Sequence, residues 1–199
     1  MNYVEYGVSR LFANARGRDA KLFTKTAAFS ALPEPTIALE SPEAGPSGSR
    51  LHSDLSAEGA GRFPTLTWSA ASPEIKQWLL VSEDPDAPLP SPIIHGIYYG
   101  IPATATGVAA ADFEAAEGQN VLKGGFQYGK NRRGNIYIPP RPLLGHGPHR
   151  YFFTIIGLNQ PIDTAHLSPL PTAQEMATEI EGKVVGWGQW VGEYERKWV

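Results

Sequence analysis

Three short segments of the chain carry residue types that can bind an ion or move a proton. They are the acidic turn at residues 84–88 (Asp-Pro-Asp-Ala-Pro), the single His95, and residues 149–151 (His-Arg-Tyr). Each lies at the edge of a predicted buried strand, so pairing of those strands would bring carboxylates and imidazoles to one cavity mouth. A nearby carboxylate favours the charged form of an imidazole, which can then donate a hydrogen bond to an anion near neutral pH.

A stiff loop leads into the third segment. Residues 139–151 contain four prolines, which fix the backbone angle φ and remove a donor, and two glycines, which allow tight turns. The loop carries Arg141, His146 and His149 as potential anion donors, and the charge of the arginine does not titrate. The chain then enters residues 151–156, which predict a strand buried on both faces. Rigid loops at the ends of core strands are common places for binding residues.

Each of these residues also has a purely structural interpretation. An aspartate before proline, as at Asp84 and Asp86, is a common turn device because its side chain bonds the local backbone. A lone histidine in an apolar strand, such as His95, is often a core residue whose hydrogen bonds are satisfied. The same interpretation applies to His149 when it is taken alone.

The patterns of several other kinds of site are missing from the sequence. Two histidines and a carboxylate suggest a metal triad, but no ligands follow helical spacing, so we expect no metal. No glycine-rich phosphate loop with its lysine occurs, and no serine lies in a nucleophile-elbow pattern. The residues alone therefore predict a cofactor-free pocket with histidine, aspartate and arginine that binds an anion.

The composition is ordinary for a globular chain. Its 199 residues are 42% hydrophobic, and the 18 prolines and 21 glycines indicate many turns and short strands. The formal net charge of −3 argues against a nucleic-acid partner held by the overall field. The sequence has no cysteine, no apolar run long enough to cross a bilayer and no signal-peptide core, so we expect a cytoplasmic location without a transmembrane segment.

Helical periodicity marks the N-terminus. Residues 2–18 predict a helix whose apolar stripe packs on the flank of the domain, and a helix at a membrane surface is the alternative. Residues 20–31 predict a second short helix or an extended arm. The stripe consists of Val4, Val8, Leu11, Phe12 and Ala15.

Strand patterns dominate the rest of the chain. A capping box at residues 172–175 begins a helix that runs to about residue 181 and that Gly182 ends. The short strands and the scarcity of helices predict a sandwich-like, mainly β domain. The predicted strands lie around Ile37 and Leu39, at Leu66 and Trp68, and at residues 78–82, 93–99 and 151–156, with a closing strand or hairpin at 187–199.

Residues 123–150 form a basic window. They hold six of the 17 basic residues of the chain and no acidic residue. Such a run is often a solvated face. Because its arginines lie beside the proline-rich loop, the window is also a candidate for contact with a ligand or a partner.

Taken together, the motifs resemble the phosphatidylethanolamine-binding protein family, which is also known through the Raf kinase inhibitor proteins. The resemblance rests on the turn at 84–88, His95, the Gly-Pro-His-Arg-Tyr run at 147–151, residues 64–68 and the closing helix, and it covers roughly residues 35–194. It implies a β-sandwich domain at 35–199 with peripheral helices near both ends, preceded by a helical extension at 1–34. It also implies a small pocket for phosphate, carboxylate or phosphorylated head groups, made by Asp84, Asp86, Pro88, His95, Pro142, His149 and Tyr151.

Some positions depart from the family pattern. Gly96 stands where a tryptophan is usual after the pocket histidine, which should widen or reshape the wall, and Leu143 replaces a proline and should add apolar surface. The N-terminal extension and the run at 140–149 look like the fungal branch of the family. Some members of that branch accompany polyketide pathways, where they are implicated in coupling maleic-anhydride units into maleidrides.

These features leave three functional hypotheses. The first is a binding protein for a small anionic or phosphorylated ligand. The second is a cofactor-independent tailoring enzyme, isomerase- or lyase-like, in which Arg141 grips a dicarboxylate or anhydride while His95 or His149 handles the proton. The third is an inhibitor of a kinase or peptidase that acts through the N-terminal extension and the basic window.

Overall fold

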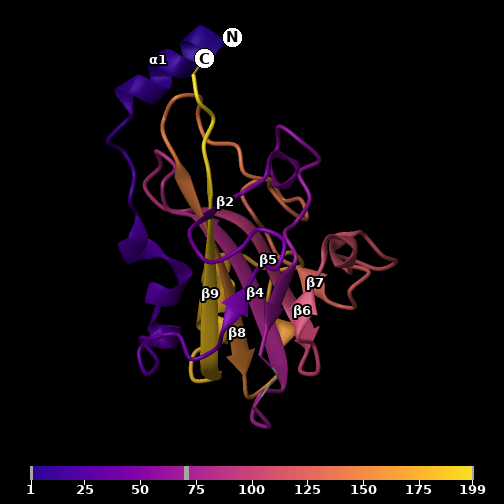
Figure 1. Ribbon diagram of the computed structural model, residues 1–199. Helices are drawn as coiled ribbons and strands as arrows, with labels where there is room; N and C mark the ends of the chain where they lie inside the picture. The colour runs from indigo at the N-terminus through magenta and orange to yellow at the C-terminus, as the bar shows by residue number, and fades with distance from the viewer. Residues whose placement is uncertain (1, 70–71, 199) are drawn as a thin grey trace.

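A six-stranded sheet runs through the middle of the molecule, and a smaller sheet packs on one of its faces (Figure 1). The computed structural model describes residues 2–69 and 72–198. From edge to edge, the large sheet consists of β2 (Ser49–Arg50), β9 (Val184–Tyr194), β8 (His149–Leu158), β4 (Gln77–Asp84), β5 (Ile93–Pro102) and β7 (Gln127–Tyr128). The small sheet consists of β1 (Leu39–Glu40), β3 (Leu66–Trp68) and β6 (Gly107–Val108).

Helical segments are short in the part of the chain that the structure describes. The α-helices are α1 (Asn2–Leu11) and α2 (Ala173–Glu179). The chain is therefore mainly β, with helices near both ends, as the sequence predicts. The 3₁₀ turns are η1 (Asp19–Lys21), η2 (Phe23–Lys25), η3 (Ala27–Phe29), η4 (Ser53–Leu55), η5 (Ala110–Phe113) and η6 (Thr164–His166).

The central strands divide their side chains between two apolar layers. Along β4, Trp78 and Leu80 join the layer under the small sheet, while Leu79 and Val81 join the opposite layer with α2 and the turns η2 and η3. Successive side chains of a strand point to opposite faces, so a strand covered on both sides is apolar at nearly every position. The same is true of β8, which confirms the prediction that residues 151–156 are buried on both faces.

The order of the strands brings three chain segments to one edge. β4 lies between β5 and β8 and is antiparallel to both. Asp84 is opposite Ile93, and Glu83 is opposite Phe152, so the end of β4 meets the beginnings of β5 and β8. The expectation that the three chemistry-bearing segments lie on neighbouring strands is confirmed.

The C-terminal elements follow their sequence signals. The amide of Glu175 donates to Thr172 Oγ1 at 3.2 Å, and the amide of Thr172 donates back to the Glu175 carboxylate at 2.8 Å. This capping box begins α2, and Gly182 follows its end with φ of +74°, a conformation that favours glycine. The closing segment is a single strand, β9, which begins three residues earlier than predicted and pairs with β8 rather than folding into a hairpin.

The N-terminal prediction needs correction. The helix ends at Leu11 instead of Arg18, and Gly17 has φ of +75°, which a continuing helix does not allow. Residues 20–31 fold mostly as the successive 3₁₀ turns η1 to η3. The predicted strand around Ile37 is also shorter, because the amides of Thr36 and Ile37 both donate to the Trp187 carbonyl and leave only Leu39 and Glu40 to pair with β3.

The apolar stripe of α1 does not pack on the domain. Val4, Val8, Leu11 and Phe12 are 73%, 40%, 79% and 42% exposed. The opposite face makes the contacts instead: Tyr6 stacks on Trp198 with 4.6 Å between ring centroids, and the Ser9 hydroxyl donates to the Leu144 carbonyl at 2.7 Å. The helix therefore docks on the C-terminal tail and a loop tip through one aromatic stack and hydrogen bonds to the loop backbone (Figure 1). Within residues 2–69 and 72–198, no helix has the length and apolar content to cross a membrane.

Glu83 generates a prediction about stability. Its side chain is buried, and its polar contacts among residues 2–69 and 72–198 are bonds of 2.9 and 3.1 Å from the Phe23 amide. Burial raises the pKa of Glu83 to about 8, although those bonds oppose the shift. The folded carboxyl thus keeps a proton that the unfolded chain loses near 4.5. Between these two pKa values the folded state binds more protons than the unfolded state, so the contribution of Glu83 to stability falls as the pH rises.

We expect the free energy of unfolding, measured with urea, to depend less on pH in Glu83→Gln than in the wild type over this interval. The amide can keep a neutral acceptor for the Phe23 amide. Glu74→Gln, at an exposed position, is the matched control and should follow the wild type. Parallel curves for the wild type and Glu83→Gln would contradict the assignment of a neutral Glu83.

Candidate functional site

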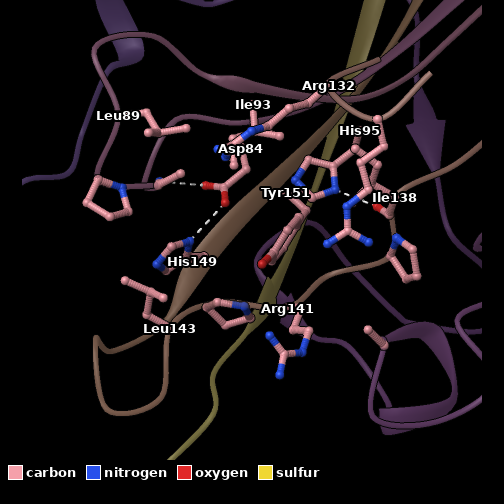
Figure 2. Close-up of a pocket in the computed structure, with 16 residues that line it drawn as sticks. Asp84, Leu89, Ile93, His95, Arg132, Ile138, Arg141, Leu143, His149 and Tyr151 are labelled. Carbon is pink, nitrogen blue, oxygen red and sulfur yellow. Dashed lines mark hydrogen bonds and ion pairs between the residues drawn. The ribbon is translucent and has the colours of Figure 1, made fainter. Parts of the chain in front are cut away.

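A cavity of about 480 Å³ opens where β4 ends and β5 and β8 begin (Figure 2). Its size suits a small molecule. The wall includes seven of the eight residues predicted from the sequence for binding or catalysis: Asp84, Pro88, His95, Arg141, Pro142, His149 and Tyr151. The remaining lining residues are Ala57, Ala87, Leu89, Ile93, Arg132, Arg133, Ile138, Pro139 and Leu143.

Asp84 is held at the cavity floor by the turn that follows it. One carboxylate oxygen accepts hydrogen bonds from the amides of Asp86 and Ala87 at 2.7 and 3.2 Å. The other oxygen accepts from His149 Nδ1 at 2.8 Å. The prolines of the turn fix the backbone that aims these amides, so the structural and the functional interpretations of Asp84 both apply. Its carboxylate is occupied by the protein on both oxygens.

His149 has no free ring nitrogen. Nδ1 faces Asp84, and Nε2 lies 2.8 Å from Nδ1 of His146. His146 is buried behind the cavity and is not part of its lining; its Nε2 lies 2.9 Å from the carbonyl oxygen of Phe12. Neither imidazole is therefore placed to donate directly to a molecule in the cavity, which differs from the expectation drawn from the sequence.

His95 presents an acceptor rather than a donor. Its Nδ1 lies 2.5 Å from the Ile138 carbonyl oxygen, which can only accept, so Nδ1 carries the proton. Burial lowers the pKa of His95, and the nearby Asp84 carboxylate opposes this effect only in part. The imidazole is then neutral near neutral pH, and Nε2 is an unprotonated nitrogen with no partner among the described residues. Figure 2 shows His95 beside Tyr151 and Asp84.

Positive charge surrounds the mouth of the cavity. Arg132, Arg133 and Arg141 are exposed, and none of them forms an ion pair with an acidic side chain in the described ranges. The one carboxylate in the lining is Asp84, whose oxygens are already engaged. Burial and the charge of Asp84 raise the pKa of Tyr151, so its hydroxyl stays protonated and able to donate. The arrangement offers donors and charge to an anion.

Asp86 lies outside the cavity. Its carboxylate makes a bidentate pair with Arg150, with distances of 2.8 Å to both Nε and Nη2, and accepts from the Gly17 amide at 3.2 Å. Burial by itself would raise the pKa of Asp86, but the bonds from Arg150 outweigh it and the pKa lies below its ordinary value. Arg150 also holds Asp19, at 2.8 and 2.9 Å. Asp86 thus joins the acidic turn, β8 and the N-terminal arm.

Two departures from the family pattern have different outcomes. The space beside Gly96 is filled, because a Cβ there would lie 2.2 Å from the Tyr98 hydroxyl, and Gly96 is not in the lining. Gly96 therefore does not itself form part of the cavity wall, and the expected widening or reshaping stays a prediction. Leu143 does line the cavity and adds apolar surface together with Leu89 and Ile93.

Several lining residues were not singled out from the sequence. Arg132 and Arg133 belong to the basic window at residues 123–150, which was predicted as a candidate contact surface without either arginine being named. Leu89, Ile93 and Ile138 carry no signal beyond an apolar side chain near a strand end. Metal ligation has no support in the described part of the chain, since no group of three histidine, aspartate or glutamate side chains is placed to hold an ion.

Comparison with known proteins identifies the family of the chain. The model of the phosphatidylethanolamine-binding protein family matches residues 41–195. A solved homologue of that family from Chlamydia trachomatis superimposes with a TM-score of 0.66 at 25% identity, covering 82% of this chain and 99% of that one. The chain belongs to the phosphatidylethanolamine-binding protein family.

Within the family, its relatives include fungal proteins. The chain is 47% identical over 199 residues to phomoidride biosynthesis cluster protein B of Talaromyces stipitatus, covering 98% of this chain and 82% of the relative. It is 45% identical over 201 residues to a protein of the same name from another fungus, covering 100% of this chain and 97% of the relative. The chain is thus a fungal-type member of the family.

Because Asp86 lies outside the cavity that Asp84 lines, we expect a substitution of Asp86 to change the stability of the fold but not ligand binding. Asp86→Asn removes the charge that Arg150 pairs with, and because Arg150 is partly exposed we expect a loss of about 2 kcal/mol in the free energy of unfolding. Affinity for a cavity ligand should change little. Urea denaturation and calorimetry measure the two quantities, with Glu74→Gln as the control, and unchanged stability would contradict this role of Asp86.

Proposed function

We propose that the chain binds a small ligand with carboxylate or phosphate groups in this cavity and serves a fungal secondary-metabolite pathway. The observation that carries the proposal is the charge of the mouth: Arg132, Arg133 and Arg141 have no acidic partner in the described ranges, while both oxygens of Asp84 are engaged by its own turn and His149. Guanidinium groups suit the planar, bidentate recognition of carboxylate and phosphate.

The apolar part of the wall narrows the ligand class. Leu89, Ile93 and Leu143 lie among the lining residues, with the arginines at the mouth and His95 among the buried residues. A ligand with anionic groups and a hydrocarbon portion matches both kinds of surface. Relatives named as phomoidride biosynthesis cluster proteins support a place in secondary metabolism.

A second candidate function uses the same cavity for catalysis. Of the two imidazoles in the lining, only His95 keeps a ring nitrogen, the buried Nε2, without a partner among the described residues, and the ring is neutral, as an imidazole must be to act as a general base. In coupling of maleic-anhydride units, Nε2 would take a proton from carbon and the arginines would stabilise the enolate-like anion. That anion forms a bond to a second unit, and the new carbanion regains the proton, so no cofactor is consumed.

We expect Arg141→Gln to weaken binding of a dicarboxylate such as maleate or succinate by roughly tenfold, because one charge-assisted hydrogen bond is lost. Isothermal titration calorimetry with the dicarboxylates and with inorganic phosphate measures the effect. Arg50→Gln is the matched control, since Arg50 is 70% exposed and pairs with Glu195 away from the cavity. Absence of binding by the wild type to every one of these probes would reject the proposed function.

The acceptor at His95 predicts that binding is linked to protons. An anion against Nε2 favours the charged imidazole, so binding of a fully ionised ligand should take up a proton and strengthen as the pH falls. Titrations in buffers of different ionisation enthalpy count that proton. His95→Gln should abolish the uptake, and equal apparent heats for the wild type in all buffers would contradict it.

Turnover separates the two candidate functions. Purified wild-type protein is incubated with an alkyl maleic-anhydride monomer, and coupled products are followed by mass spectrometry. Coupling that is lost in His95→Gln but kept in His166→Gln, an exposed histidine, would establish the enzymatic role. Binding without coupling would leave the binding function alone.

A further inference from the structure

A chain of three hydrogen bonds leads from the cavity floor to Phe12, the residue directly after helix α1. It runs from Asp84 through His149 and His146 to the carbonyl of Phe12, with heavy-atom distances of 2.8, 2.8 and 2.9 Å. Asp84, His149 and His146 are only 3%, 2% and 3% exposed. Water therefore has little access to the three side chains, and each bond must be supplied by the groups themselves.

The number of protons in this chain is fixed by its two ends. A carbonyl oxygen and a carboxylate can only accept, so the three bonds need three protons on the ring nitrogens. Two neutral imidazoles carry only two protons. The complete chain therefore holds one extra proton, and the charge of this imidazolium is balanced by Asp84.

We propose that His146 is a positioning residue for the cavity. Through this one shared proton, His146 joins the cavity floor to the end of the N-terminal helix. His149 then donates to Asp84 and to Nδ1 of His146, and His146 donates from Nε2 to Phe12. Burial lowers the pKa of His146, against the bond to the Phe12 carbonyl, which agrees with a neutral His146.

The surrounding charges are few and mostly engaged. Besides Asp84, the Arg16 guanidinium approaches the loop and donates to the Pro148 carbonyl. Glu5 on α1 pairs with Arg196, and Arg150 is held by Asp86 and Asp19. Asp84 is therefore the carboxylate that stabilises the extra proton, and Arg16 acts against it.

We call the hydrogen-bonded chain from Asp84 through His149 and His146 to Phe12 the latch, and it acts on the loop that forms one wall of the cavity. Arg141, Pro142 and Leu143 line the cavity directly before Leu144, and helix α1 bonds both backbone groups of Leu144, at 2.7 Å from Ser9 and 3.2 Å to Glu5. His146 closes the same loop against Phe12 two residues later. Loss of the shared proton leaves two protons for three hydrogen bonds. One of the bonds that connect Phe12, His146, His149 and Asp84 must then break.

The proton count is measurable in the full-length protein without a ligand. We expect nitrogen-15 NMR of the imidazoles near neutral pH to show three N–H groups across His146 and His149. On raising the pH, one N–H should disappear while the amide signals of residues 12–14 shift. Two N–H groups over the whole accessible range, or amide signals that do not follow the histidines, would overturn the proposal.

Two substitutions distinguish the bond from His146 to Phe12 from the bond between His146 and His149. His146→Gln places an amide near the position of Nε2 and can keep the Phe12 bond, whereas His146→Asn places one near Nδ1 and can keep the His149 bond. Both should abolish the coupled shift of the residue 12–14 amides, and His166→Gln should preserve it. If either variant fails to fold, the wild-type proton count still decides the matter.

The last measurement rests on the proposed function. Both variants should weaken succinate or phosphate binding by about three- to tenfold, the effect of one hydrogen bond, although residue 146 does not line the cavity. Unchanged affinity with intact wild-type binding would reject the positioning role. If the wild type binds neither probe, the proposed function fails while the proton count still tests the latch.

Discussion

The carboxylate of Asp84 is the interaction on which the rest of the site depends. It closes the acidic turn by accepting two amides, and it fixes His149 by accepting from Nδ1. A buried carboxylate is costly without such partners, and here three donors compensate it. Because one oxygen of this carboxylate shapes the turn and the other orients the imidazole, backbone geometry and site electrostatics are inseparable at this residue. Removing the charge would disturb both.

The N-terminal arm is part of the architecture around the cavity. Residues 12–19 of this arm make three contacts around the site: the Phe12 carbonyl bonds His146, the Gly17 amide donates to Asp86, and Asp19 accepts from Arg150. None of these residues lines the cavity, yet each holds a residue of the motifs that do. The assignment of residues 1–34 as a separate extension stays a prediction, and the contacts explain how a peripheral segment can influence a site that it does not enter.

Much of the fold follows from local patterns. The capping box of α2 and the doubly buried strands depend on neighbouring residues, so the sequence predicts them well. The N-terminal helix is different, because a stripe at helical spacing says nothing about which face the rest of the molecule offers. Here Tyr6 stacks on Trp198, near the other end of the chain, and no local sequence pattern predicts a contact between residues so far apart.

The candidate site shows the same limit. Motif order identifies Asp84, His95 and His149, but the direction of each hydrogen bond depends on partners such as the carbonyls of Ile138 and Phe12. Those partners lie on other segments, and they make His95 an acceptor and close both nitrogens of His149. Residue type indicates what a side chain can do. Its packing determines which of those options remains.

The unpaired arginines at the mouth also have a consequence for how a ligand arrives. Exposed charges act over about 8 Å at physiological ionic strength, so a cluster of like sign attracts an anion before contact. For the proposed ligand, added salt should therefore slow the encounter far more than the departure, since the part of the wall formed by Tyr151 is buried while the arginines are exposed. In the proposed function, the entrance would set the rate of capture and the interior the residence time.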